Sequence, residues 1–441
     1  MNSTSASDSP ALPSHAVRRP ASAQMRRVIF ASSLGNGLEI YDFTVYSFFA
    51  VIIGQLFFPS GSAVASLLMS LATFAVGFVM RPLGALLIGR VADRRGRKAA
   101  LSLTIALMTL GTGIIAFTPT YASIGISASV LLVIARLLQG LSMGGEVGCA
   151  SAFLMESGRT DNRCFMVSWQ GASQGAAALL GAGTGLLLTS SLSHESLLAW
   201  GWRVPFVIGL LIGPVGWYIR QQLDETHTAT ATASSLTQLV RAHGRTLAMG
   251  MGWMAAPTVT MYMVVYYMPT YLTQTLGRPQ SFGFALVALA SALLAIITPI
   301  AGRYADRFTR RKPLLYAVTT LAVLTVYPSF ILLSQENTLL CVLAITLLIL
   351  PLAIGLAPSM AMLMEAFPRD RRVTGLSIIY SFGVTLFGGF SPLLVTWLIG
   401  MTGNPLTPAL YLTAAAPWPC ASCAGCQSTP AVPEEQERSD S

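Results

Sequence analysis

The sequence predicts an all-α membrane protein made of two six-helix bundles. Three observations support this: apolar composition, an internal duplication and the distribution of positive charge. Of the 441 residues, 53% are hydrophobic and 10% are charged, whereas soluble globular domains carry about 25% charged residues. Apolar runs of roughly 20 residues recur along the chain, as expected of helices that cross about 30 Å of hydrocarbon. A soluble protein with one large core is therefore disfavoured, and the net charge of +9 does not indicate a nucleic-acid partner.

The duplication is marked by a basic sequence. Residues 89–98 (GRVADRRGRK) carry six charges in ten positions, and the pattern returns 213 residues later as GRYADR at 302–307. The two lysines of the chain, Lys98 and Lys312, belong to these two regions. A second pair of similar loops lies at 156–163 and 365–372, an offset of 209 residues. Repeats at nearly the same distance indicate two related halves.

Apolar segments divide the chain in order. Residues 1–27, rich in Ser, Ala and Pro, predict a disordered cytoplasmic tail without a signal peptide. The first bundle is expected at 28–220, with apolar segments at 28–56, 64–89, 100–118, 124–155, 165–191 and 203–220. A polar linker follows at 221–245. The second bundle is expected at 246–413, with segments at 246–275, 281–302, 313–333, 338–364, 373–400 and from 406 onward.

The sorting of positive charge tests this segment count. When the amino terminus and every second loop are assigned to one side, that side holds 23 of the 27 Lys and Arg residues. The opposite side keeps Arg203 and Arg278, while Arg81 and Arg136 fall inside apolar segments. The positive-inside rule then places both termini and the linker in the cytoplasm. We expect a multi-pass protein of a bacterial-type cytoplasmic (inner) membrane.

The twelfth segment is the weak one. After Tyr411 the run LTAAA meets Pro417 and Pro419, and a polar tail with three cysteines follows. Proline inside a helix costs about 3 kcal/mol and removes a backbone donor. Residues 414–441 are therefore interpreted as an atypical, frameshifted or divergent end, which leaves the integrity of helix twelve in doubt.

Sequence motifs argue against enzymatic chemistry and against a bound metal. Two GxSxG matches, at 140–144 and 171–175, lie inside predicted helices, whereas a nucleophile elbow requires a strand-to-helix turn and a His partner. The CxxCxxC at 420–426 lacks a fourth ligand nearby. No Walker A loop is present, so ATP-driven transport has no support. We expect no enzyme activity, no metal and no cofactor.

Several motifs resemble a known family. Residues 89–98 resemble the signature loop between helices 2 and 3 of the major facilitator superfamily. More narrowly, GNGLEIYDF at 35–43 is similar to the first helix of the metabolite:proton symporter family. Further similar stretches are MRPLG at 80–84, RLLQG at 136–140 with GGE at 144–146, SWQ at 168–170 with SQ at 173–174, and WGWRVPF at 200–206. The resemblance implies the major facilitator fold; known substrates of that family include citrate, 2-oxoglutarate, shikimate, proline and betaine.

Charged residues inside the membrane are the candidates for proton coupling, because each costs about 2.5–3.5 kcal/mol at a helix centre. Glu39 and Asp42 are three residues apart and share a face of the first helix. Arg136 on the fourth helix is the natural counter-charge, and the resemblance allows an Asp42–Arg136 pair. Two readings stay open: a permanent ion pair that fixes helix packing, and a pair that exchanges partners with proton and substrate.

Polar residues on other segments are candidates for substrate binding. Gln170 and Gln174 are four residues apart on the fifth helix and could donate hydrogen bonds to a carboxylate, although interhelical packing is an equal alternative. Tyr267 could contact substrate or belong to an interfacial aromatic belt. Arg81, at the end of the second helix, is assigned to the cavity or the gate. Arg136 and Gln139 complete the predicted set.

The two basic loops are predicted to form a gate, since their charges lie at the cytoplasmic surface rather than at the midplane. By resemblance, Asp93 and Arg97 take part in a charge network that locks the two bundles together. Asp306 and Arg310 repeat the device in the second half. The predicted gate also includes the neighbouring charges Arg94, Glu156, Arg307 and Glu365.

Together these features predict a proton-coupled symporter that works by alternating access. The expected partners are a proton, a small-molecule substrate and the lipid bilayer, and a monomer is expected. A citrate-like di- or tricarboxylate is the favoured substrate. A zwitterionic osmolyte such as proline or betaine is the alternative within transport. Outside transport, a non-transporting receptor on the same fold is a further alternative.

Overall fold

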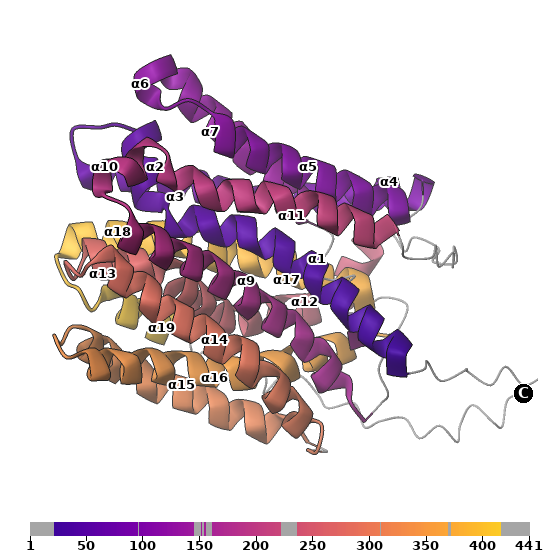
Figure 1. The fold of residues 1–441 in the computed structure, drawn as a ribbon. Coiled ribbons are helices and arrows are strands. Elements are labelled where there is room, and N and C mark those ends of the chain that lie inside the picture. Colours follow the sequence, from indigo (N-terminus) through magenta and orange to yellow (C-terminus); the bar gives the residue numbers. More distant parts are fainter. Residues whose placement is uncertain are drawn as a thin grey trace, which may run out of the picture.

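The computed structural model describes residues 22–95, 97–144, 151, 154–155, 161–221, 236–308, 310–368 and 372–415, and this part of the chain contains helices and no strands. Each of the twelve predicted membrane segments contains a described helix. The long helices run roughly along one common direction (Figure 1). The all-α architecture expected from the sequence is therefore confirmed.

The first half is a set of six helical paths. They are α1 (Ser22–Phe48) continued by α2 (Ala50–Phe57); α3 (Ala63–Val79) continued by α4 (Arg81–Arg95); α5 (Arg97–Phe117); the single turn α6 (Tyr121–Ile124) followed by α7 (Ile126–Ser142); α9 (Arg163–Ser191); and α11 (Val204–Gln221). The short helix α10 (His194–Ala199) and the turn η1 (Gly201–Arg203) lead into α11. The first path bends by 67° between Glu39–Phe48 and α2.

The second half repeats the arrangement. Its helices are α12 (Leu236–Met261), η2 (Tyr262–Tyr267) and α13 (Met268–Gln274) in one path; α14 (Gln280–Ala305); α15 (Lys312–Leu333); α16 (Thr338–Glu365); α17 (Arg372–Val384), η3 (Thr385–Gly389) and α18 (Ser391–Thr402) in one path; and α19 (Thr407–Ala415). The segments η2 and η3 are π-helical. Such wide turns inside α-helices are frequent at functional sites.

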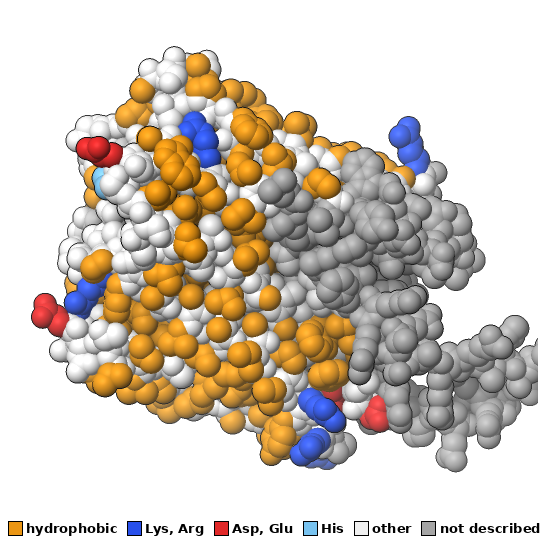
Figure 2. Space-filling model, in the orientation of Figure 1, with side chains coloured by type: hydrophobic (Ala, Val, Ile, Leu, Met, Phe, Trp, Pro, Cys, Tyr) orange, Lys and Arg blue, Asp and Glu red, His pale blue; other side chains and the backbone are white. Residues whose placement is uncertain are grey.

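The outer surface of the helices is apolar. Figure 2 shows hydrophobic side chains over the middle of the visible face and charged side chains toward its ends. Large apolar side chains are widely exposed on the described helices, for example Ile296 at 61%, Ile300 at 64% and Leu324 at 67%. By length and composition, five described helical stretches could cross a membrane, and the bent α1–α2 pair would be a sixth. This surface fits lipid rather than water.

Small residues allow the helices to approach closely. A Cβ atom added at Gly175 of α9 would lie 2.6 Å from the backbone nitrogen of Ala295 on α14. Helices α9 and α14, one from each half, lie side by side along their lengths (Figure 1). Within the first half, a Cβ atom added at Gly140 of α7 would lie 1.7 Å from the carbonyl oxygen of Gly77 on α3. Glycine at these contacts sets the helix spacing.

We predict that Gly140→Ala lowers stability, because the added methyl group must push α7 away from α3. Overpacking of this kind typically costs about 1–3 kcal/mol. The measurement is the thermal unfolding midpoint of purified protein in detergent. Gly183→Ala is the matched control, since a Cβ atom at Gly183 of α9 would meet no atom within 4 Å. Equal midpoints for the two variants would contradict the prediction.

Helix α19 is the described part of the predicted twelfth segment. Its nine residues rise by about 13 Å, less than half of the roughly 30 Å hydrocarbon core. Ala409 and Leu412 are buried, and the hydroxyl groups of Tyr411 and Ser391 lie 3.0 Å apart. The helix therefore packs into the second half through its first two turns. Of the segment predicted to be atypical, 414–441, only Ala414 and Ala415 are described.

Candidate transport site

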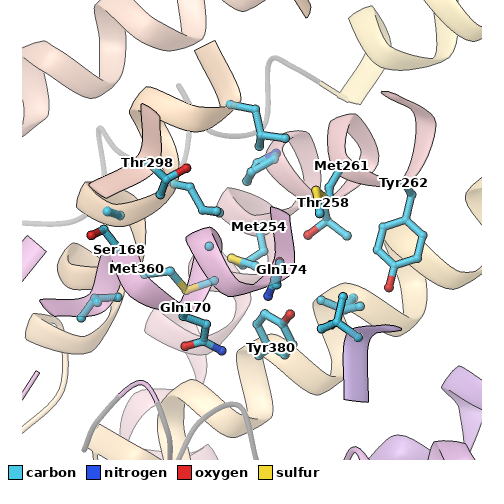
Figure 3. A pocket seen from close by; sticks show the side chains of 18 of the residues that line it. Ser168, Gln170, Gln174, Met254, Thr258, Met261, Tyr262, Thr298, Met360 and Tyr380 are labelled. Atoms are coloured by element: carbon cyan, nitrogen blue, oxygen red, sulfur yellow. The ribbon is translucent and has the colours of Figure 1, made fainter. Parts of the chain in front are cut away.

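A cavity lies between the two halves (Figure 3). Its lining comes from α1, α4 and α9 of the first half and from α12, η2, α14, α16 and α17 of the second. The polar lining residues are Arg81, Ser168, Gln170, Gln174, Thr258, Tyr262, Tyr266, Thr298 and Tyr380. Methionine and leucine side chains complete the wall, among them Met254, Met261 and Met360.

Arg81 is the one charged residue among the described residues that line this cavity. It follows the break between α3 and α4, and its side chain is 3% exposed. Its guanidinium lies 4.1 Å from the ring centre of Phe78 and 5.2 Å from that of Phe43. Nη2 donates to the sulfur of Met143 at 3.4 Å, and Nε has no hydrogen-bond partner among the described residues. A buried guanidinium with an unused donor can bind an anion.

Gln170 and Gln174 both line the cavity, as expected of substrate-binding residues. The Oε1 atom of Gln170 accepts a hydrogen bond from the hydroxyl group of Ser151, while its buried Nε2 has no partner among the described residues. The amide of Gln174 and the hydroxyl group of Tyr380 point toward one another (Figure 3). The two amides can therefore supply hydrogen-bond donors to the cavity.

Tyr267, the tyrosine predicted to contact substrate, lies outside the cavity lining. Its hydroxyl oxygen accepts a hydrogen bond from Thr396 of α18 at 2.7 Å. Tyr262 and Tyr266, from the same path, line the cavity instead. Tyr262 and Tyr266 are four residues apart and share one face of this path, whereas Tyr267 lies on another face. The cavity meets the face that carries Tyr262 and Tyr266.

The predicted proton-coupling residues lie beside the cavity rather than in its lining. Asp42 and Arg136 are buried, at 4% and 0% exposure, but they form no direct ion pair. The Arg136 Nη1 donates to Oε1 of Gln139 at 2.8 Å, and Nε2 of Gln139 donates to the Thr112 hydroxyl oxygen at 3.0 Å. The Thr112 hydroxyl in turn donates to Oδ2 of Asp42. The expected contact is thus replaced by a three-bond chain; Glu39, one turn away, is also buried.

A second cluster of charges joins the two halves at the end predicted to be cytoplasmic. Asp306, after α14, accepts hydrogen bonds at 2.8 Å from the backbone N–H groups of Cys164 and Phe165 in the first turn of α9. Glu365, at the end of α16, contacts Arg163 of α9 at 3.2 Å and Arg311 at 2.8 Å. We name these residues, Arg163, Asp306, Arg311 and Glu365, the interbundle latch.

The latch includes two of the eight residues predicted for the gate. Asp306 and Glu365 belong to it, whereas Arg307 and Arg310 are exposed. Arg307 lies over the ring of Tyr304 at 5.6 Å. The side chains of Asp93, Arg94 and Arg97, and residue Glu156, lie outside the described part of the chain. Arg163 and Arg311 occupy the latch positions that the sequence alone did not single out.

Arg311 is the residue that ties the latch together. Its Nη2 lies 3.8 Å from Oδ1 of Asp306 while its Nη1 binds Glu365. Burial alone would lower the pKa of its guanidinium, but Cys164, Glu365 and Asp306 together raise the pKa above its usual value. Arg311 therefore stays charged at every physiological pH.

Comparison with known proteins identifies the family. The sequence matches the sugar (and other) transporter family over residues 28–227 and 218–416. A citrate-proton symporter from Klebsiella pneumoniae is 35% identical over 409 residues, covering 91% of this chain and 92% of that protein. A proline/betaine transporter from Salmonella typhimurium is 34% identical over 405 residues, covering 88% of this chain and 81% of that protein. The chain belongs to the proton symporters of the major facilitator superfamily.

Solved structures agree on the fold of this major facilitator protein. The xylose transporter XylE from E. coli, in a partially occluded inward open conformation, superimposes with a TM-score of 0.73 at 15% identity, covering 91% of this chain and 97% of the other. A crystal structure of D-xylose-proton symporter superimposes with a TM-score of 0.73 at 18% identity, covering 90% of this chain and 97% of the other. The predicted fold class is confirmed, and the protein is a transporter rather than an enzyme.

In this transporter the two halves are in contact on both sides of the cavity. The latch closes the end where α14 terminates. At the other end of α14, the ring of Phe284 lies 5.8 Å from the rings of both Phe48 and Phe49. The hydroxyl group of Ser47 also donates to the backbone oxygen of Tyr266 at 3.1 Å. Opening the cavity to either side of the membrane therefore requires one of these two sets of contacts to break.

We predict that Glu365→Gln opens the latch end more often, because the neutral amide loses its charge attraction to Arg163 and Arg311. Cys164 is a built-in reporter, since it is fully buried beside Asp306. The test uses a variant whose other cysteines are replaced by alanine. Loss of the half-buried ion pairs of Glu365 should destabilise the closed end by roughly 1–2 kcal/mol, so alkylation of Cys164 should accelerate about 5- to 20-fold.

The control is Glu336→Gln, which removes an exposed carboxylate on the loop before α16. Its alkylation rate should equal that of the parent. An unchanged rate in Glu365→Gln would show that the latch does not hold this end closed.

Proposed function

We propose that the protein carries a small organic carboxylate, a citrate-like di- or tricarboxylate in the favoured case, together with protons by alternating access. The observation that carries this proposal is Arg81, the one charged residue among the described cavity lining. The protein would work in a bacterial cytoplasmic membrane with both termini in the cytoplasm, as the positive-inside rule indicates.

The chemistry of the cavity favours an anionic group on Arg81. A carboxylate that leaves water needs charge-assisted hydrogen bonds to offset its desolvation. The guanidinium of Arg81 can supply them, and Nε2 of Gln170 on α9, which has no partner among the described residues, adds a further donor. The lining offers no described carboxylate to compete for these donors.

The relatives support two substrate classes. The similarity to a citrate-proton symporter supports a carboxylate with more than one acidic group. The similarity to proline/betaine transporters supports a zwitterion as the second candidate. Tyr262, Tyr266 and Tyr380 in the lining favour that candidate, because aromatic faces bind quaternary ammonium groups. Both candidates place a carboxylate on Arg81.

Proton coupling is assigned to Asp42, with Glu39 as a second carboxylate on the same helix. Each inward charge gains about 2.3 kcal/mol per 100 mV of membrane potential. Protonation of Asp42 would permit reorientation of the loaded transporter, and release of the proton inside would complete the cycle. The interbundle latch would govern opening toward the cytoplasm.

The test is uptake by proteoliposomes with an imposed inward proton gradient. Citrate, a dicarboxylate, a monocarboxylate, proline and betaine are compared at equal concentration, with and without a protonophore. Protonophore-sensitive accumulation of citrate or the dicarboxylate supports the favoured proposal. Accumulation of betaine or proline alone would replace it with the zwitterion. No accumulation of any of these solutes by correctly inserted protein would overturn both.

A further inference from the structure

We propose that Thr112 and Gln139 are positioning residues that hold the Asp42 carboxylate and transmit its protonation state to Arg136. This inference rests on the proposed proton coupling through Asp42. It starts from the geometry of one chain of hydrogen bonds that crosses α7, α5 and α1.

The direction of every bond in this chain is fixed by chemistry. A guanidinium can only donate, so the Gln139 oxygen must face Arg136. The Gln139 amide nitrogen must then donate to Thr112, whose oxygen accepts and whose single hydroxyl proton is left for Asp42. All three donors thus point from the cation toward the carboxyl group.

The chain exists in this form only when Oδ2 of Asp42 carries no proton. A proton on Oδ2 would meet the hydroxyl proton of Thr112, so the hydroxyl would have to turn away and lose its acceptor. The other oxygen, Oδ1, is buried without a hydrogen-bond partner among the described residues. It faces Gly209 of α11, where an added Cβ atom would lie 2.3 Å from it. A proton on Oδ2 therefore breaks the chain at Thr112, whereas a proton on Oδ1 keeps the chain but adds a buried donor that has no acceptor among the described residues.

The groups around the carboxyl that carry or change charge are few. Arg136 faces it from α7, and Glu39 and Tyr41 belong to its own helix. The two elements in closest contact, α5 and α11, present Thr112 and Gly209, which do not titrate in the physiological range. The Thr112 hydroxyl is consequently the one described hydrogen-bond donor to the ionised form of Asp42.

The far end of the chain reaches the cavity through one aromatic ring. The guanidinium of Arg136 lies 4.0 Å from the ring centre of Phe43, and that of Arg81 lies 5.2 Å from the same ring. Phe43 follows Asp42 in the sequence. A change in the position of Arg136 therefore moves the ring against which the cavity arginine packs.

The test is a titration of the purified transporter that needs no substrate. Infrared difference spectra follow the carboxyl C=O band between pH 4 and 10, and Asp42→Asn identifies the Asp42 component. Thr112→Val removes the hydroxyl group at nearly constant volume. We expect the Asp42 band to titrate about one to two pH units higher, because the donor to the ionised form is lost. Thr112→Ser should restore the parent midpoint.

Matched variants make the result decisive. Thr109→Val removes a hydroxyl group one turn earlier on α5, outside the chain, and should leave the midpoint unchanged. Gln139→Met lacks the amide and should shift the midpoint upward, which provides a second route if Thr112→Val does not fold. Unshifted midpoints in both Thr112→Val and Gln139→Met, or an equal shift in Thr109→Val, would overturn the proposal. A wild-type protein that transports none of the tested solutes would refute the proposed function while leaving this titration interpretable.

Discussion

Asp42→Asn is expected to abolish accumulation of substrate while preserving exchange. The amide is isosteric with the carboxylate and can still accept a hydrogen bond from the hydroxyl of Thr112, but it cannot bind a proton. For a transport cycle that moves one net charge, 100 mV sustains a concentration ratio of about 50-fold across the membrane. In the variant the substrate concentration inside the proteoliposomes should be about equal to that outside. The measurement is steady-state accumulation in proteoliposomes under an imposed proton gradient, alongside counterflow of labelled substrate.

The control for this prediction is Glu195→Gln on α10, which neutralises an exposed carboxylate outside the cavity. It should accumulate substrate like the parent protein. Accumulation that persists in Asp42→Asn would transfer the coupling role to Glu39, the other buried carboxylate of α1. Loss of counterflow together with accumulation would indicate that the variant is misfolded or locked.

Arg81→Gln is expected to weaken substrate binding by about 10- to 100-fold. Loss of a charge-assisted hydrogen bond costs about 1.5–3 kcal/mol, and every 1.4 kcal/mol changes the dissociation constant tenfold. Arg81→Lys should recover only part of the affinity, since an ammonium group does not stack on Phe78 as a guanidinium does. The measurement is the dissociation constant from calorimetric or fluorescence titration.

Arg278→Gln is the matched control for charge removal. Its guanidinium donates to the backbone oxygen of Gln335 outside the cavity, so substrate affinity should be unchanged. Equal affinity in Arg81→Gln and the parent protein would exclude a salt bridge between this arginine and the substrate. Parent-like affinity in Arg81→Gln with loss of transport would instead move Arg81 to the gating machinery.

Sequence reasoning predicted the helical segments well because membrane helices leave a strong, continuous signal. Hydrophobic runs, repeated basic loops and the sorting of positive charge each constrain the same twelve segments. It also placed Arg81, Gln170 and Gln174 in what proved to be the cavity wall, since polar side chains inside apolar helices are costly and face the protein interior.

The sequence could not reveal features that depend on exact side-chain reach. Thr112 is an ordinary residue within an apolar segment, and nothing in its neighbours distinguishes it from a threonine that bonds its own helix. Whether Asp42 and Arg136 form a direct pair depends on the distance between their helices, which the sequence does not give. In the structure the Arg136 guanidinium donates to Gln139 instead. The sequence also did not show which face of the tyrosine-rich path meets the cavity: Tyr262 and Tyr266 line it, whereas Tyr267 contacts Thr396.

Arg310, predicted for the gate, is exposed in the structure, whereas Arg311 belongs to the interbundle latch. Arg310 and Arg311 are adjacent and chemically identical, and only the loop conformation decides that Arg311 reaches Glu365. Its counterpart in the first half is Arg163, the first residue of α9. Arg163 is far from Glu365 in the sequence, and only the fold brings the two side chains into contact. Charge patterns thus named Asp306 and Glu365 of the interbundle latch, but not Arg163 and Arg311, which bind Glu365.

The contact between α9 and α14 has a kinetic consequence. At Gly175 the nearest atoms of α14 are backbone atoms of Ala295 and Ser291, so no side chain stands between the two helices at that point. Because no side chains have to pass one another at this point, the contact should add little to the free-energy barrier for rotation of one half against the other. The activation barrier of the transport cycle would then reside in the contacts at the two ends of α14. Turnover should accordingly vary more steeply with substitutions at those ends than with changes along the glycine-lined crossing.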